Sequence, residues 1–194
     1  MKSSLLVSRI RAHALLCSVL FLAACGPKRV TSPIVLTHER TAALAARTAG
    51  RVGPADIYPD LSITSGVAAS DVTQANIQST ICVPGFTKSP RRPPSSYTDA
   101  LKVKGFTQYG LADHAKGHFE EDHLISLELG GDPRDPKNLW PEPYNASLPD
   151  GGARFKDRVE KYLNRQVCQG KMTLAEAQKA IVEDWYQVYL TKVK

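Results

Sequence analysis

An acidic residue followed directly by a histidine, Asp122-His123, opens the short apolar run Leu124-Ile125. A carboxylate can hold a hard divalent cation through its oxygen atoms. An imidazole titrates near neutral pH and can take a proton from water. The pair therefore combines a candidate metal ligand, Asp122, with a candidate general base, His123.

Two glycines and an asparagine follow this pair at short spacing. Gly130-Gly131 predicts a tight reversal of the chain, because glycine tolerates positive φ. The reversal would bring Asn138 back beside His123. The side-chain oxygen of Asn138 could then accept the free imidazole N–H and fix the tautomer of the ring.

Together, residues 122–123, 130–131 and 138–139 resemble the HNH branch of the His-Me finger (ββα-metal) nucleases. The segments 138–143 (NLWPEP), 156–160 (Lys-Asp-x-x-Glu) and 167–170 (Val-Cys-x-Gly) look like a subgroup of secreted bacterial HNH-type proteins. The resemblance covers about Val72 to Tyr189. It implies an α+β fold with a small ββα-metal core and additional packing helices.

The resemblance also implies roles for single residues. His123 would be the general base and Asp122 a metal ligand, and Asn138 would orient His123 or stabilise the loop. The cofactor would be a divalent ion, Mg²⁺ first, with Mn²⁺ or Zn²⁺ as alternatives. Lys156 or Arg158 could contact a phosphate oxygen of the substrate.

One departure from the family pattern concerns the ligand that closes the metal site. Many HNH proteins have a histidine at the start of the helix after the second strand, but no histidine follows His123 here. Asp157, in the first turn of the expected helix, or Asn145, in the loop before it, could take that place. Asp157 equally suits a helix start, where the helix dipole stabilises an acid. A second acid–His pair, Asp113-His114, is followed by His118, and we expect it on the surface.

The N-terminus has the pattern of an export signal. Lys2, Arg9 and Arg11 precede an apolar run from Ala14 to Ala24, which is too short to span a bilayer. Small residues before Cys25 look like a bacterial lipobox, which implies cleavage after residue 24 and a lipid anchor at Cys25. An ordinary signal peptide is the alternative. Gly rather than Asp after Cys25 indicates the outer membrane if the host is Gram-negative.

The charge of the exported chain is modest. The full chain of 194 residues has 25 basic and 19 acidic side chains, and removal of the three basic residues of the leader leaves 22 against 19, or +3. A case for nucleic acid must therefore rest on local patches. The segment from Ile81 to Gly110 could be one, because five basic side chains, one acid and four aromatic residues lie there. A solvated surface with aromatic residues in the core is the alternative.

Two cysteines remain after removal of the leader and assignment of Cys25 to lipid. In an oxidising compartment Cys82 and Cys168 predict a disulfide, and two separate buried thiols are the alternative. The bond would close a loop of about 86 residues and contribute roughly 4 kcal/mol in the chain-entropy model. A structural zinc site is disfavoured because no Cys-x-x-Cys occurs.

The chain divides into a leader (1–24), a Pro-interrupted tether (25–70) and an HNH-like domain (71–194). We expect strands from Phe119 and over Asn138–Trp140, with the following prolines starting a loop. Apolar periodicity predicts a helix over Ala153–Val167, and a capping box at Thr173 predicts the start of the last helix.

Two functions fit these observations. The first is a metal-dependent endonuclease of low sequence specificity that acts on DNA or RNA outside the cytoplasm. The second is a non-catalytic envelope lipoprotein that uses the same fold as a binding scaffold. The acid–His pair favours the first, and the missing closing histidine and modest charge favour the second.

Overall fold

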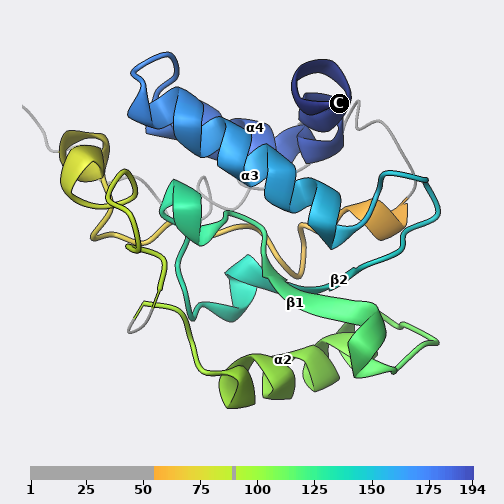
Figure 1. Cartoon of the computed structure of the whole chain (residues 1–194). Coiled ribbons are helices and arrows are strands. Elements are labelled where there is room, and N and C mark those ends of the chain that lie inside the picture. Colours follow the sequence, from red (N-terminus) through yellow and green to blue (C-terminus); the bar gives the residue numbers. More distant parts are fainter. Residues whose placement is uncertain (1–54, 89–90) are drawn as a thin grey trace, which may run out of the picture.

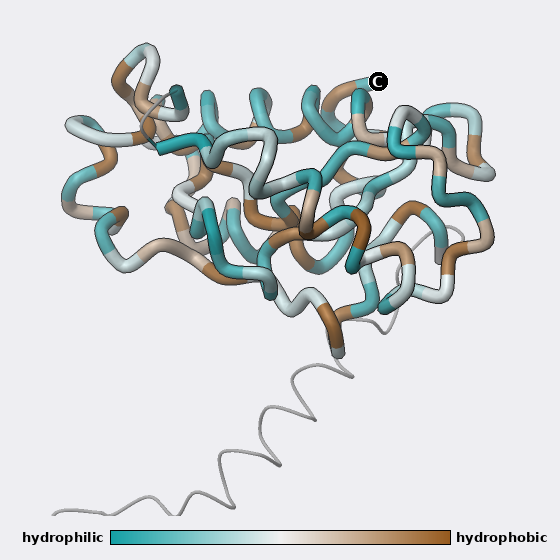
Figure 2. The backbone as a smooth tube through the Cα atoms, turned by 90° about the horizontal axis from the view of Figure 1, so that it is seen from below, coloured by the Kyte–Doolittle hydropathy of each residue, from teal (hydrophilic) through white to brown (hydrophobic). Residues whose placement is uncertain are grey.

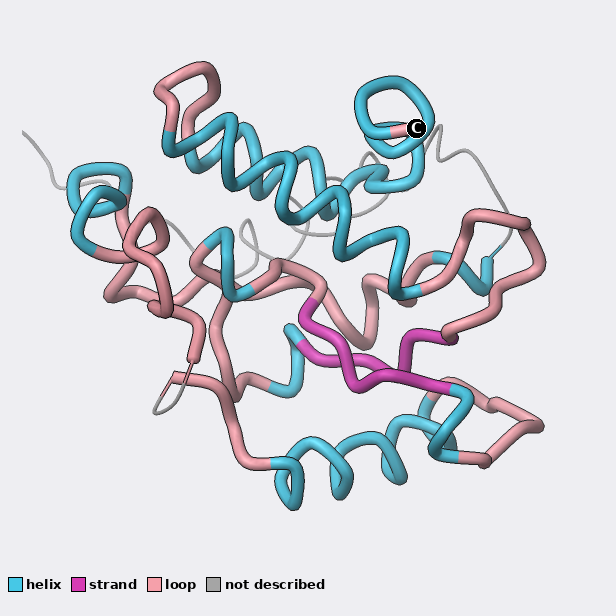
Figure 3. Tube along the Cα trace, viewed as in Figure 1, coloured by secondary structure: helices cyan, strands magenta, loops and turns pink. Residues whose placement is uncertain are grey.

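The computed structural model describes residues 55–88 and 91–194. Over these residues, helices combine with one two-stranded antiparallel sheet, which confirms the α+β class (Figure 1; Figure 3). The main elements are α2 (Ser95–Gln108), β1 (Phe119–His123), β2 (Leu139–Pro143), α3 (Ala153–Cys168) and α4 (Leu174–Val188). The predicted leader, the lipid anchor at Cys25 and most of the tether lie outside the described residues.

The sheet pairs β1 with β2, from Phe119 opposite Pro143 to His123 opposite Leu139. The connection between the strands turns at Gly130, which has a φ of 71°, as the Gly-Gly motif predicts. β2 starts one residue later than expected and continues through two prolines. A strand of a two-stranded sheet has a free edge, so a proline without an N–H can lie in it.

Helices cover the sheet on both sides (Figure 1). α2 packs below the strands, and Gly105 makes this close approach possible, since a Cβ there would lie 2.8 Å from Pro141. α3 and α4 pack together above the strands. Hydrophilic and hydrophobic residues alternate along the backbone, as amphipathic elements require (Figure 2).

The expected helices near the C-terminus are confirmed. α3 buries Val159, Leu163 and Val167 along one face. α4 begins with the predicted capping box, in which the Thr173 hydroxyl accepts the Glu176 N–H and the Glu176 carboxylate accepts the Thr173 N–H. No helix among the described residues has the length and apolar character needed to cross a membrane.

The folded unit begins earlier than the predicted boundary at residue 71. Ile57, Tyr58 and Leu61 are buried in the same core as α3 and α4. The indole N–H of Trp185, on α4, donates to the Ile57 carbonyl at 2.9 Å. The prediction that residues 55–70 belong to the tether is therefore wrong. The segment has few apolar residues, and polar residues separate them, so its sequence does not indicate this packing.

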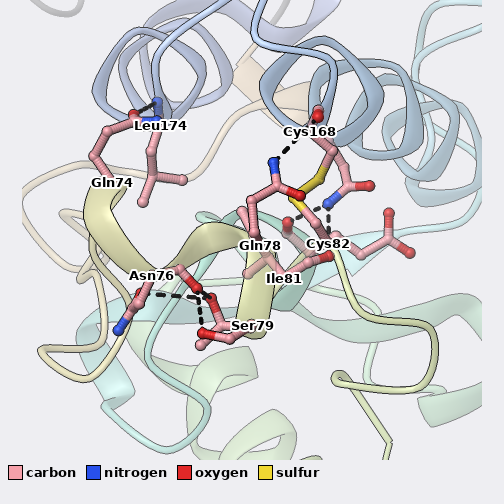
Figure 4. Close-up of a disulfide and its surroundings, with 11 residues drawn as sticks. Gln74, Asn76, Gln78, Ser79, Ile81, Cys82, Cys168 and Leu174 are labelled. Carbon is pink, nitrogen blue, oxygen red and sulfur yellow. Dashed lines mark hydrogen bonds between the residues drawn. A yellow bond between two sulfur atoms is a disulfide. The ribbon is translucent and has the colours of Figure 1, made fainter.

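The predicted disulfide between Cys82 and Cys168 is present (Figure 4). It ties the segment after the 3₁₀ helix Gln74–Ser79 to the C-terminal end of α3. The Gln78 side chain supports the link by donating to the Cys168 carbonyl at 3.3 Å. Nearby, Gln74 accepts the backbone N–H of Leu174 and so connects the same segment to α4.

Replacement of both cysteines by alanine should lower the free energy of unfolding by about 2–5 kcal/mol, because the unfolded chain gains the entropy of an open loop. Chemical denaturation of the oxidised wild type and of the double variant measures the difference. An unchanged denaturation midpoint would show that the bond contributes nothing to stability.

Candidate functional site

The end of β1 faces a cavity of about 290 Å³ at the place where α3 approaches the strand. His123 lines this cavity, and so do the exposed side chains of Arg92 and Lys161. Six carboxyl side chains from β1, the 3₁₀ helix Leu127–Leu129 and α3 also line it: Glu120, Glu121, Asp122, Glu128, Asp157 and Glu160. The structure therefore gathers an imidazole, several acids and two cations around one space.

The imidazole of His123 is held in one orientation by the backbone. Its Nε2 lies 3.1 Å from the carbonyl oxygen of Pro133. A carbonyl only accepts hydrogen bonds, so Nε2 must carry the proton and the neutral ring has its lone pair on Nδ1. Nδ1 has no hydrogen-bond partner within residues 55–88 and 91–194. The free nitrogen is therefore the one that could accept a proton from a ligand in the cavity.

The surroundings of His123 favour the neutral ring. Burial lowers the pKa of His123, and this outweighs the opposing effect of the Asp122 carboxylate. The ring is thus deprotonated at neutral pH, which is the state that a general base requires.

We predict that an NMR titration of His123 gives a pKa below its ordinary value of 6.5. The unfolded state then binds more protons between the two values, so stability should fall as the pH drops below about 6.5. A His123 pKa above 6.5 would contradict the neutral assignment.

Asp122 forms a buried ion pair with Lys156. The ammonium of Lys156 is fully buried and lies 2.5 Å from Asp122 Oδ2. The same ammonium donates to Glu160 Oε1 at 2.5 Å and to the His123 carbonyl at 2.9 Å. All three of its N–H groups are used, which corrects the prediction that Lys156 contacts a substrate phosphate.

Glu142 completes this interior cluster from β2. Its side chain is fully buried, and no donor among the described residues reaches either carboxylate oxygen. Burial and the adjacent Asp122 raise the pKa of Glu142 well above its ordinary value. This shift favours the uncharged form of the Glu142 carboxyl beside Asp122. Although burial opposes ionisation of Asp122, the neighbouring ammonium of Lys156 keeps the pKa of Asp122 low.

Asn138 takes the second of the two roles expected for it. Its Oδ1 accepts the N–H groups of Ile125 and Val67, and its Nδ2 donates to the carbonyls of Ile125 and Asp132. No hydrogen bond joins it to the described imidazole of His123, so it does not orient the ring directly. It stabilises the loop that carries Pro133, and Pro133 holds the ring.

Asn138→Ala should lower the free energy of unfolding by about 2–4 kcal/mol, because each buried polar group without a partner costs about 1–3 kcal/mol. Asn138→Asp is the matched variant, since it keeps the acceptor but turns an oxygen towards two carbonyls. Denaturant titrations of both variants measure the effect. An Asp variant as stable as the wild type would show that the two donated bonds are dispensable.

The remaining predicted residues are separated by the fold. Asp157 is half-buried and lines the same cavity as His123. Asn145 is exposed and lines other cavities, so it does not approach this site. Arg158 is directed away, and its guanidinium packs on Tyr189 at 5.2 Å and donates to the Tyr189 hydroxyl. The predicted phosphate contact of Arg158 is not supported by this position.

The donor set does not fit a divalent metal ion held through Asp122. Lys156 occupies its Oδ2, and the described residues contain no group of three or more histidine, cysteine or acidic side chains arranged to hold an ion. Asp157 has a raised pKa because of burial and repulsion from Asp122. The expected Mg²⁺ site, with Asp122 and Asp157 as ligands, therefore lacks a matching geometry.

Three residues at the cavity received no individual role from the sequence. Arg92 and Lys161 lie where a phosphate could be contacted, and Arg92 belongs to the basic segment between Ile81 and Gly110. Glu121 directly precedes the acid–His pair, and burial raises its pKa to about 8. Its position two residues before His123 on a strand, which places both side chains on one face, could have indicated it.

A larger cavity of about 960 Å³ lies elsewhere, against β2 and the end of α2. Its lining includes Tyr109, Trp140 and several prolines, but no histidine, lysine or arginine. The smaller cavity is therefore the better candidate for acid–base chemistry.

Comparisons of the chain with protein-family models, with curated proteins and with solved structures found no match.

Proposed function

We propose that this protein is an endonuclease-type hydrolase that cleaves phosphodiester bonds of DNA or RNA with low sequence specificity, with His123 as general base. The observation that carries the proposal is the neutral His123 ring at the cavity. Its Nε2–H is held by the Pro133 carbonyl, and its Nδ1 has no hydrogen-bond partner among the described residues. The order β1, β2, α3 supports a ββα core of the HNH type.

The cavity offers an acid to match this base. Glu121 and His123 line the same space, and their pKa values are shifted in opposite directions, to about 8 for Glu121 and below 6.5 for His123. At neutral pH one is a protonated acid and the other an unprotonated base. Such a pair is how one site supplies both halves of acid–base catalysis.

In the proposed reaction, Nδ1 of His123 takes a proton from water as the water oxygen attacks phosphorus. The bond from phosphorus to the leaving oxygen breaks, and the Glu121 carboxyl donates its proton to that oxygen. Arg92 and Lys161 offset the charge on the non-bridging oxygens. Burial also raises the pKa of Glu160 to about 8, so the cavity is less negative than its acids indicate.

His123→Ala should abolish cleavage of plasmid DNA and RNA, and Glu121→Gln should reduce it by roughly 10²–10⁴-fold, the usual contribution of a positioned acid. The pH profile should be bell-shaped, rising through the lowered pKa of His123 and falling near pH 8. His118→Ala is the matched control, because His118 is exposed and pairs with Asp113 in a second acid–His pair. Cleavage that persists in folded His123→Ala would overturn the proposal.

A non-catalytic scaffold is the second candidate, and one observation favours it. The carboxyl groups around the cavity outnumber its two cations, which opposes the entry of a phosphate. On this alternative, folded wild type cleaves nothing under any metal condition, and any nucleic-acid or cell-wall binding is the same in His123→Ala. Binding measured by fluorescence anisotropy beside the cleavage assay separates the two functions.

A further inference from the structure

The ammonium of Lys156 lies inside the protein among groups that bind cations through oxygen. Its side chain is fully buried on α3, and its three hydrogen bonds go to Asp122, Glu160 and the His123 carbonyl. Glu142 lies near enough to act on its charge. Two carboxyl oxygens and a carbonyl oxygen are the donors that a hard cation would otherwise use.

A divalent ion at Asp122 would have to displace this ammonium. Oδ2 of Asp122 is already bonded at 2.5 Å, and a buried double charge beside a buried single charge of the same sign is strongly unfavourable. The Lys156 side chain has no exposed surface through which it could withdraw without local opening of α3.

We propose that Lys156 is a built-in cation that takes the place of a divalent metal ion at Asp122, so that the protein binds no metal ion through Asp122. Lys156 thereby acts as a positioning residue. It compensates the charge of Asp122 and fixes the end of β1 through the His123 carbonyl.

This inference goes beyond the proposed hydrolase function and does not require it. Metal binding is measured without any substrate, so an absence of cleavage leaves the test intact. A cleaving enzyme that bound metal through Asp122 would overturn the inference and leave the hydrolase proposal standing.

The first comparison uses the purified chain and its Asp122→Asn variant. Mn²⁺ is titrated into each, and free Mn²⁺ is followed by electron paramagnetic resonance, with Mg²⁺ as a competitor. We expect Mn²⁺ to bind both proteins with the same affinity or to bind neither of them. Mn²⁺ binding that weakens roughly 10-fold or more in Asp122→Asn overturns it, because loss of a coordinating group costs at least that much.

A second comparison removes the ammonium in two ways. Lys156→Ala removes the charge and leaves space, whereas Lys156→Met removes the same charge and fills the space. We expect Mn²⁺ to bind and to raise the Tm of Lys156→Ala only, and the added Asp122→Asn substitution to abolish this effect. If Lys156→Ala folds and gains no Mn²⁺ site, Lys156 does not stand in for a metal ion and the inference fails. Should neither Lys156 variant fold, the Asp122→Asn comparison decides alone.

Discussion

The arrangement of the site depends on one buried ion pair, between Lys156 on α3 and Asp122 on β1. Both groups are removed from water, so their attraction must offset a large desolvation cost. Hydrogen bonds offset this desolvation cost, because every N–H of the ammonium has an oxygen acceptor. A pair of this kind tolerates little displacement. It therefore fixes the separation of helix and strand, and with it the cavity beside His123.

A second set of constraints acts on the loop between the strands. Gly131 packs so closely on the Ile125 carbonyl that a Cβ would lie 1.7 Å from the oxygen. Asn138 then donates hydrogen bonds from inside the loop to the carbonyls of Ile125 and Asp132. These contacts place the Pro133 carbonyl where it selects the His123 tautomer. A backbone arrangement thus decides which imidazole nitrogen is available for chemistry.

Much of the fold was predictable from the sequence because its signals are local. The capping box at Thr173 and the apolar period of α3 describe helices without knowledge of the rest of the chain. The disulfide was predictable from the number of cysteines together with the predicted export. The packing of Ile57 and Tyr58 against α4 was not predictable, since contacts across more than 120 residues leave no pattern in a short window.

The site was predictable in part. The Asp122-His123 pair and Asp157 do meet at one cavity. The positions of Lys156 and Arg158 were not predictable. Side chains two residues apart on a helix lie on different faces, and which of the two is buried depends on the elements that pack against the helix. A basic side chain in a helix usually faces water. Lys156 departs from this rule because buried acids from two strands and from its own helix surround it.

The disulfide has a consequence for the integrity of the protein. The bond between Cys82 and Cys168 closes a loop that contains α2, both strands and nearly all of α3. Every residue that lines the cavity of the candidate site lies within this loop. One cut of the backbone anywhere in that loop leaves two pieces that are still covalently joined. The chain can thus be cut once within the loop without release of any part of its site.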